Sequence, residues 1–148
     1  MNQYIASLAN TCLSLASANL EFYAESVPEN FAVPALYFPP SEVDSSESAL
    51  NSFRTRRTIY AKVFASDRNG ALEIAEGIQQ GIILYRCHIP LYDVDGKATG
   101  AHFKVEPPDA RIIDEGLAQI TLSYTLISGF PEEDIPKVKS VGINKYYS

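Results

Sequence analysis

The positions of apolar residues along the chain predict two helices and several strands. Residues 3–17 place their apolar side chains on one helical face, and residues 67–83 repeat the spacing of an amphipathic helix. Residues 59–65 and 118–126 instead alternate apolar with polar side chains, which is typical of strands that bury one face. The apolar stripe of the second helix consists of Ala71, Ile74, Ala75, Ile78 and Ile82.

Weaker patterns add shorter elements. We expect a turn at Asp93-Val94-Asp95-Gly96, because Gly96 tolerates a positive φ. Ser66 is the expected N-cap of the second helix. Short strands are expected at Leu20–Ala24, directly after Pro34, at Tyr85–Tyr92 and at Ala101–Glu106.

Two further segments need interpretation. Ser41–Ser52 is rich in Ser, Glu and Asp, and we interpret it as an exposed loop. Gly81 lies four residues after Gly77 on the second helix. Gly81 either frays the helix end or lets a neighbouring element approach closely, and the sequence leaves both interpretations open.

These elements predict an α+β fold, in which a mostly antiparallel sheet carries two main helices on one face. Ile78, Ile120 and Leu122 are expected to be buried in one core. One domain is the default for a chain of 148 residues. We expect this domain to span residues 1–130 and a C-terminal extension, in which periodicity is lost, to span residues 131–148.

Charge is distributed unevenly along the chain. Residues 1–53 contain six carboxylates and no Lys or Arg, so the net charge of −6 lies in the first third. Affinity for nucleic-acid phosphates requires clustered cations. We therefore expect no specific binding of nucleic acid, and no adhesion to an anionic membrane surface for the same reason. No apolar run approaches the 18 residues typical of a membrane-spanning helix.

The chain contains residue types that often act in catalysis, but their spacing matches no catalytic motif. Cys87 and His88 are adjacent in an expected strand and therefore point to opposite faces. His102, on the expected partner strand, is able to approach one of them. Asp93 and Asp95 are similar to the start of a calcium loop whose later ligands are missing, so the alternatives are a solvated turn and a loosely held divalent ion between subunits. We expect no enzyme activity, no cofactor and no metal.

The chain has one cluster of cations, at Arg54, Arg56 and Arg57. In a strand, Arg54 and Arg56 share a face. The cluster is either a solvated strand end or a site that binds carboxylates of a partner or sister subunit, because arginine forms bidentate pairs with carboxylates. Those carboxylates are expected in the acidic 41–52 segment of a neighbouring subunit.

The order of several segments is similar to that of one protein family. These segments are the first helix, VPENFAVPALYFPP, the acidic loop, RRTIYAKVFA, RNGALEIAEGIQQGI, the hairpin around DVDG, and EGLAQITLSYTL. Over most of residues 1–130 this order resembles the tail terminator (tail completion) proteins of tailed bacteriophages and phage-tail-like particles.

The resemblance implies a structural subunit without catalytic activity. Such subunits form a ring, with six copies expected, that caps the tail tube, ends its polymerisation and joins it to the head connector. The implied partners are further copies of the chain, a tail tube protein and a head–tail connector protein. The implied location is the tail or neck of a virion, after synthesis in the cytoplasm of a host bacterium. DNA is expected to pass through an anionic ring without being held.

Two alternatives remain beside the ring subunit. One is another head–tail joining or baseplate adaptor protein, and the other is a small ligand-binding or enzymatic α+β domain. For a ring, we expect Arg54, Arg56 and Arg57 to supply electrostatic contacts and aromatic residues near the C-terminus to supply apolar anchors at the subunit or partner interface. These aromatic residues are Phe130, Tyr146 and Tyr147.

Overall fold

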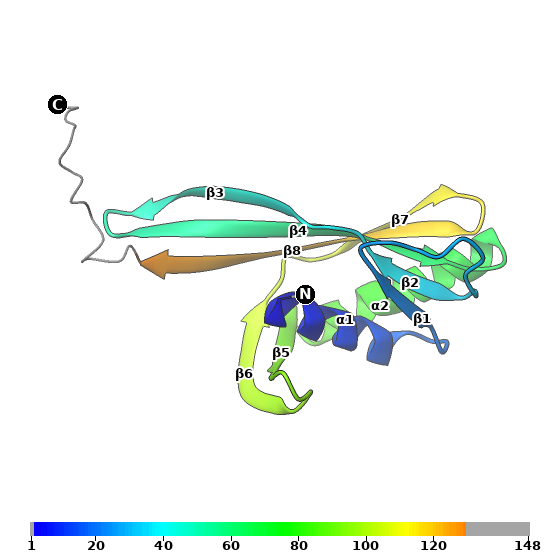
Figure 1. Cartoon of the computed structure of the whole chain (residues 1–148), viewed down its shortest axis with the longest axis horizontal. Helices are drawn as coiled ribbons and strands as arrows, with labels where there is room; N and C mark the ends of the chain where they lie inside the picture. The colour runs from blue at the N-terminus through cyan, green and yellow to red at the C-terminus, as the bar shows by residue number, and fades with distance from the viewer. Residues whose placement is uncertain (1, 130–148) are drawn as a thin grey trace. The chain divides into compact units, whose positions relative to one another are not determined.

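The structure is a computed structural model that describes residues 2–129 (Figure 1). These residues form two helices and eight strands. The elements are α1 (Gln3–Leu15), β1 (Glu21–Ala24), β2 (Ala35–Phe38), β3 (Glu42–Ala49), β4 (Ser52–Phe64), α2 (Arg68–Leu84), β5 (His88–Tyr92), β6 (Ala98–Lys104), β7 (Asp109–Asp114) and β8 (Leu117–Gly129).

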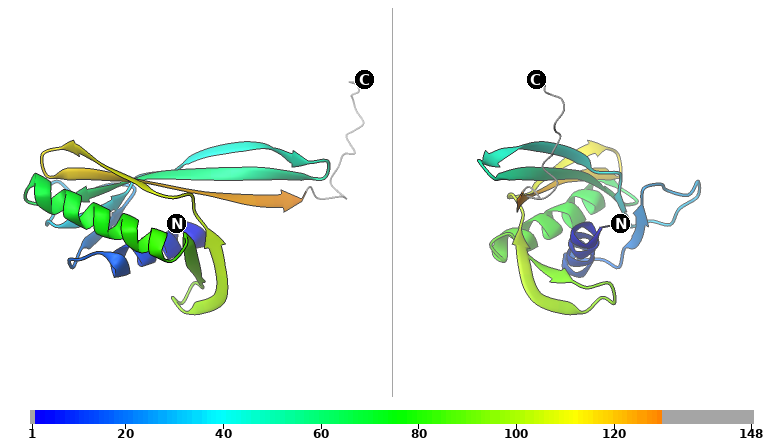
Figure 2. Two further views of the ribbon diagram at one scale, coloured as in Figure 1. Left: turned by 180° about the vertical axis from the view of Figure 1, so that it is seen from behind. Right: turned by 60° about the vertical axis from the view of Figure 1, so that its left-hand side comes forward.

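The main sheet has six strands among the described residues, in the order β1-β2-β4-β8-β7, with β3 paired to β4 beside this path. β1 and β2 run parallel, whereas β2 pairs with β4 and β7 pairs with β8 in antiparallel fashion. A separate antiparallel sheet contains β5 and β6. The predicted fold class, α+β with a mostly antiparallel sheet and two helices on one face, is confirmed (Figure 2).

The protein consists of two compact units. The first unit contains Met1–Val43 and Arg57–Thr125. The second unit contains Asp44–Arg56 and continues from Leu126, with Gly129 as its last described residue. The predicted boundary at residue 130 stays a prediction, since residues 130–148 lie outside the described part of the chain.

The core of the first unit follows the apolar periodicity. All five residues of the predicted stripe on α2 are buried. On β8, Ile120 and Leu122 are fully buried, as is Ile78 on α2. Gln119 and Thr121, on either side of Ile120, are half-buried, so the predicted alternation along this part of β8 matches the burial of its side chains.

An aromatic cluster adds to this core. The Tyr4 and Phe103 ring centroids lie 5.1 Å apart, edge to face, and Phe103 lies 5.4 Å from Tyr124. Tyr4 and Tyr124 are stacked at 5.7 Å. The three rings come from α1, β6 and β8 and so connect these elements. Aromatic pairs at these separations stabilise packing beyond the area they bury.

α1 is also held to the β5–β6 sheet. Its N-cap is Asn2, whose side chain accepts a hydrogen bond from the Ile5 amide at 2.8 Å. Ser7 Oγ accepts from the Tyr92 amide at 2.9 Å, and the Gln3 side chain donates to the Tyr92 carbonyl at 2.9 Å. Both backbone groups of Tyr92 are thus satisfied by α1, which fixes the end of β5.

The second unit has no buried residue in its described part. Every residue of Asp44–Arg56 and 126–129 is exposed or half-buried. Its hairpin of β3 and β4 closes at Leu50 and Asn51, and the Leu50 side chain is 92% exposed. The described part of this unit is therefore a sheet that buries none of its side chains.

The expected loop at Ser41–Ser52 is wrong. Glu42–Ala49 is strand β3, paired to β4. The sequence is misleading because β3 is held by main-chain pairing and buries none of its side chains, so no apolar alternation marks it.

Two smaller expectations also differ. The N-cap of α2 is Asp67 and not Ser66: Asp67 is extended, and its Oδ1 accepts from the Gly70 amide at 2.7 Å. Strand β7 has no counterpart in the sequence-based prediction. Its residues alternate charged side chains with half-buried Ala110 and Ile112, a weak pattern typical of an edge strand.

Candidate functional site

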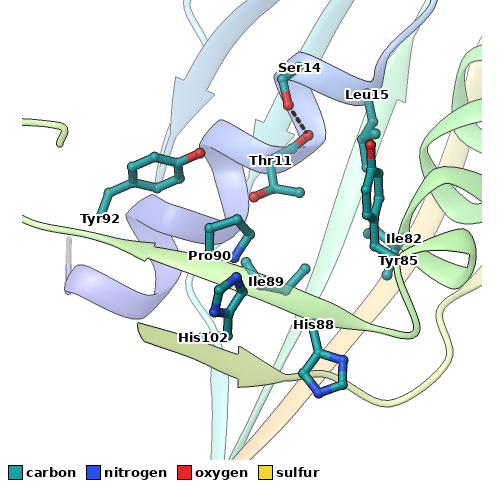
Figure 3. A pocket seen from close by; sticks show the side chains of 10 residues that line it. All are labelled: Thr11, Ser14, Leu15, Ile82, Tyr85, His88, Ile89, Pro90, Tyr92 and His102. Atoms are coloured by element: carbon teal, nitrogen blue, oxygen red, sulfur yellow. Dashed lines mark hydrogen bonds between the residues drawn. The ribbon is translucent and has the colours of Figure 1, made fainter. Parts of the chain in front are cut away.

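A cavity of about 560 Å³ lies between α1, the end of α2 and the β5–β6 sheet (Figure 3). Its lining combines apolar side chains with hydroxyl, phenol and imidazole groups. The lining residues are Thr11, Ser14, Leu15, Ile82, Tyr85, His88, Ile89, Pro90, Tyr92 and His102.

The end of α2 shapes this cavity. Tyr85 is the C-cap, and Arg86 and Cys87 follow it with φ of 59° and 63°, in the left-handed region. The Cys87 amide donates to the Ile82 carbonyl at 2.9 Å, so the chain turns back tightly into β5. Sequence reasoning did not foresee this turn, because neither left-handed residue is Gly or Asn.

The polar groups of the cavity do not converge on one point. Thr11 Oγ1 is buried and has no hydrogen-bond partner among the described residues, while Ser14 Oγ donates to the Thr11 carbonyl at 2.9 Å. His102 lies beside Pro90, whereas His88 points away from α1 (Figure 3). The arrangement offers a partly apolar hollow with single hydrogen-bonding groups.

The two cysteines are free and buried. Cys87 lies just before β5 and is 7% exposed, whereas the next residue, His88, is exposed. His102 pairs with Pro90 on the neighbouring strand. Burial raises the pKa of the Cys12 thiol to about 12, so this thiol is protonated at neutral pH. Within residues 2–129 no group of three or more His, Cys, Asp or Glu side chains is placed to hold a metal ion.

The predicted turn at Asp93–Gly96 is present. Gly96 has φ of 81°. Asp93 Oδ1 accepts hydrogen bonds from the amides of Asp95 and Lys97, both at 2.9 Å. The carboxylate that would begin a cation site is therefore used to close the turn, which favours the interpretation as a solvated hairpin tip.

The three arginines lie on β4. Arg54 and Arg56 are exposed and share a face, and Arg57 is half-buried on the other face. Arg54 Nη2 donates to Ser48 Oγ at 3.4 Å, and Arg57 Nη1 donates to Ser41 Oγ at 3.1 Å.

The acidic segment and the arginines are closer than expected. β3, which carries Glu42, Asp44 and Glu47, is a direct strand neighbour of β4 in the same chain. The hydrogen bonds of Arg54 and Arg57 go to serines of this neighbouring segment, and the pairing of the arginines with carboxylates of another subunit remains an expectation. A role of Arg54, Arg56 and Arg57 at an interface stays a prediction.

The aromatic part of the predicted interface lies outside the described residues. Phe130, Tyr146 and Tyr147 belong to residues 130–148. Their assignment as apolar anchors remains a prediction. Neither helix within residues 2–129 combines the length and apolar character that crossing a membrane requires.

Comparison with known proteins gives two relatives. No family model matches the chain. The chain is 29% identical over 134 residues to "Uncharacterized protein YqbJ" of Bacillus subtilis (strain 168), with 90% of each chain covered. It is 25% identical over 126 residues to "Phage-like element PBSX protein XkdJ" of the same organism, which covers 85% of this chain and 86% of the relative. The chain is thus related, at modest identity, to a protein of a phage-like element.

Proposed function

We propose that this protein is a non-catalytic structural subunit of a phage-type tail, which assembles into a ring of six copies. The ring caps the tail tube, ends its polymerisation and provides the joint to the head connector. The observation that carries the proposal is the similarity to a protein of a phage-like element over 85% of the chain. The match extends over most of both chains, 85% of this chain and 86% of the relative.

The second unit supports an assembly role. A three-stranded sheet normally needs a hydrophobic face or a packed helix for independent stability. In this unit no described residue is buried, and Leu50 and Ile127 are 92% and 65% exposed. A surface of this kind gains burial by contact with another protein chain.

The charge distribution is compatible with DNA passage. The acidic excess of −6 per chain gives a ring an anionic character. DNA phosphates then meet like charge, and no counterion-releasing contacts hold the strand. The proposed role thus includes transit of DNA without specific binding.

The first test is the assembly state of the full chain, measured by light scattering after size exclusion and by negative-stain electron microscopy. We expect rings, either alone or after addition of the tail tube protein from the same genome. In a polymerisation assay we also expect the protein to stop tube growth or to reduce the length of the tubes. A chain that remains monomeric with tube protein present, and leaves tube growth unchanged, would refute the proposal. Binding to the connector without an effect on tube growth would indicate a head–tail adaptor in its place.

A further inference from the structure

We propose that β3 of one copy docks alongside β6 of the next copy and so forms the contact between subunits. The inference rests on the proposed ring, and it names the two surfaces that a ring contact needs. A head-to-tail contact uses two different surfaces of the same chain, one on each side of the subunit. β3 and β6 are candidates because both are open strand edges and their charges are opposite.

Each strand has one free edge among the described residues. β3 pairs only with β4, and β6 pairs only with β5. The two strands have similar lengths, eight residues in β3 and seven in β6. An open edge presents unpaired main-chain N–H and C=O groups, which a strand of another chain is able to pair with.

The charges of the two edges are complementary. β3 carries Glu42, Asp44 and Glu47 and no cation. Residues 97–105, which include β6, carry Lys97, His102 and Lys104 and no carboxylate. All of these side chains are exposed. Opposite potentials on two facing surfaces fix orientation and disfavour the wrong pairing of like edges.

The regular part of the β6 edge begins after a bulge. Gly100 has φ of 86°, and the β5–β6 register shifts between Pro90 and Tyr92. From His102 onward the pairing is regular, with His102 opposite Pro90 and Lys104 opposite His88. Phe103 is buried between them, so His102 and Lys104 share the face of the sheet opposite to Phe103.

The β3 strand offers a matching pair. Glu42 and Asp44 are two residues apart and share one face of β3, as His102 and Lys104 share one face of β6. Two carboxylates and two nitrogen bases with the same spacing are able to face one another across neighbouring strands. The other face of β3 adds Glu47, which increases the acidity of the whole edge.

A charge-reversal experiment tests the pairing. One variant carries Glu42→Lys and Asp44→Lys, and the other carries His102→Glu and Lys104→Glu. In the first variant both edges are basic, and in the second both are acidic. Each variant alone should therefore associate roughly tenfold more weakly than the natural chain, since each exposed pair changes an association constant by a few-fold. Mixing the two variants should restore assembly, because an alternating ring of six places opposite charges at every contact.

The controls separate this pairing from a general charge effect. Glu73→Lys combined with Glu76→Lys changes the same number of charges on the exposed face of α2 and should leave assembly unchanged. Arg68→Glu, also exposed on α2, is the control for added acidity. Circular dichroism checks that each variant is folded. Assembly of the natural chain should also weaken as salt rises.

Hydrogen exchange of the natural chain provides a test that requires no variant. Amides of Glu42–Ala49 and of residues 101–104 should exchange more slowly in the assembled form than in dilute subunits. Rings that form normally from both reversal variants, or reversal variants that fail to recover on mixing, would overturn the inference and leave the proposed ring intact. Unchanged exchange at both strands in a ring would do the same. Absence of any assembly by the natural chain would instead overturn the proposed function, and this inference with it.

Discussion

Leu15 on α1 lies directly against the backbone of α2 at Gly81. A Cβ added at Gly81 would lie 2.9 Å from Leu15 Cδ2 and 3.0 Å from Cδ1. The interpretation of Gly81 as a point of close approach is therefore confirmed. This contact joins the two helices beside the cavity that Leu15 and Ile82 line.

Alanine at Gly77 and at Gly81 should have different effects on stability. Both glycines lie inside α2, where alanine is favoured over glycine by about 1 kcal/mol. Nothing lies within 4 Å of a Cβ at Gly77, so Gly77→Ala should raise the free energy of unfolding by about 0.5–1 kcal/mol. Gly81→Ala should raise the free energy of unfolding by less than Gly77→Ala does, or should lower it, because the Leu15 side chain must move to make room for the added methyl group. Urea denaturation of both variants checks this, and equal gains would contradict the close contact.

Truncation of Ile78 should reveal the main core. Ile78 is fully buried on α2, and Ile78→Ala should lower the free energy of unfolding by about 2–5 kcal/mol. Ile83 on the same helix is 46% exposed, so Ile83→Ala is the matched control and should cost under about 1 kcal/mol. Chemical denaturation measures both values. A cost near zero at Ile78 would mean that this residue is not in the core.

Thr58 and Ser123 form a buried hydrogen bond between hydroxyls 3.0 Å apart. Thr58→Val leaves the Ser123 hydroxyl buried without this partner and should cost about 1–3 kcal/mol. Adding Ser123→Ala removes the unsatisfied group. The double variant should therefore lose less unfolding free energy than the two single variants lose in sum. A double-mutant cycle of unfolding free energies measures this coupling, and strict additivity would contradict it.

Cys12 should make stability fall at alkaline pH. Burial raises the pKa of its thiol from the ordinary 9.0 to about 12. Below pH 9 the thiol is protonated in both the folded and the unfolded state. Above pH 9 the unfolded state loses a proton that the folded state keeps, so the free energy of unfolding should fall by about 1.4 kcal/mol per pH unit until the folded thiol ionises.

Comparison with Cys12→Ala isolates this contribution. Other groups also titrate above pH 9, but they are common to both proteins. From pH 9.5 to pH 11 the unfolding free energy of the natural chain should therefore fall more steeply than that of Cys12→Ala. A difference between the two proteins that stays constant over this range would show that Cys12 ionises equally in both states.

Apolar periodicity was sufficient to predict the elements that bury a face. The stripe on α2 and the alternation in β8 fall where the core requires them. Two strands that bury no side chain, β3 and β7, are not predicted by this pattern. β3 was interpreted as a loop and β7 was not foreseen, because main-chain pairing stabilises these strands and leaves no period in their side chains.

The candidate surfaces were harder to predict than the core. A cluster such as Arg54, Arg56 and Arg57 is visible in sequence, but its neighbour β3 becomes known only when the hairpin is recognised. The cavity depends on side chains from four elements and on a left-handed turn at Arg86 and Cys87. Local patterns carry no information about such distant contacts. The opposed charges of β3 and β6 were present in the sequence, yet their meaning depends on both strands having open edges.

Removal of residues 130–148 should separate folding from assembly. Tyr124 is the last buried residue of the described chain, and its strand, β8, ends at Gly129. The shortened chain should therefore keep its circular dichroism spectrum and its unfolding transition. We expect it to lose ring formation or tube capping, because exposed ion pairs contribute only about 0–1 kcal/mol each and an apolar anchor is needed besides them.

Phe130→Ala and the pair Tyr146→Ala with Tyr147→Ala should reproduce part of this loss in the full chain. Leu84→Ala, at a side chain that is 81% exposed and does not line the cavity, is the control for loss of a large exposed apolar group. If the shortened chain unfolds, residues 130–148 belong to the core, and if it assembles normally, the aromatic anchor lies elsewhere.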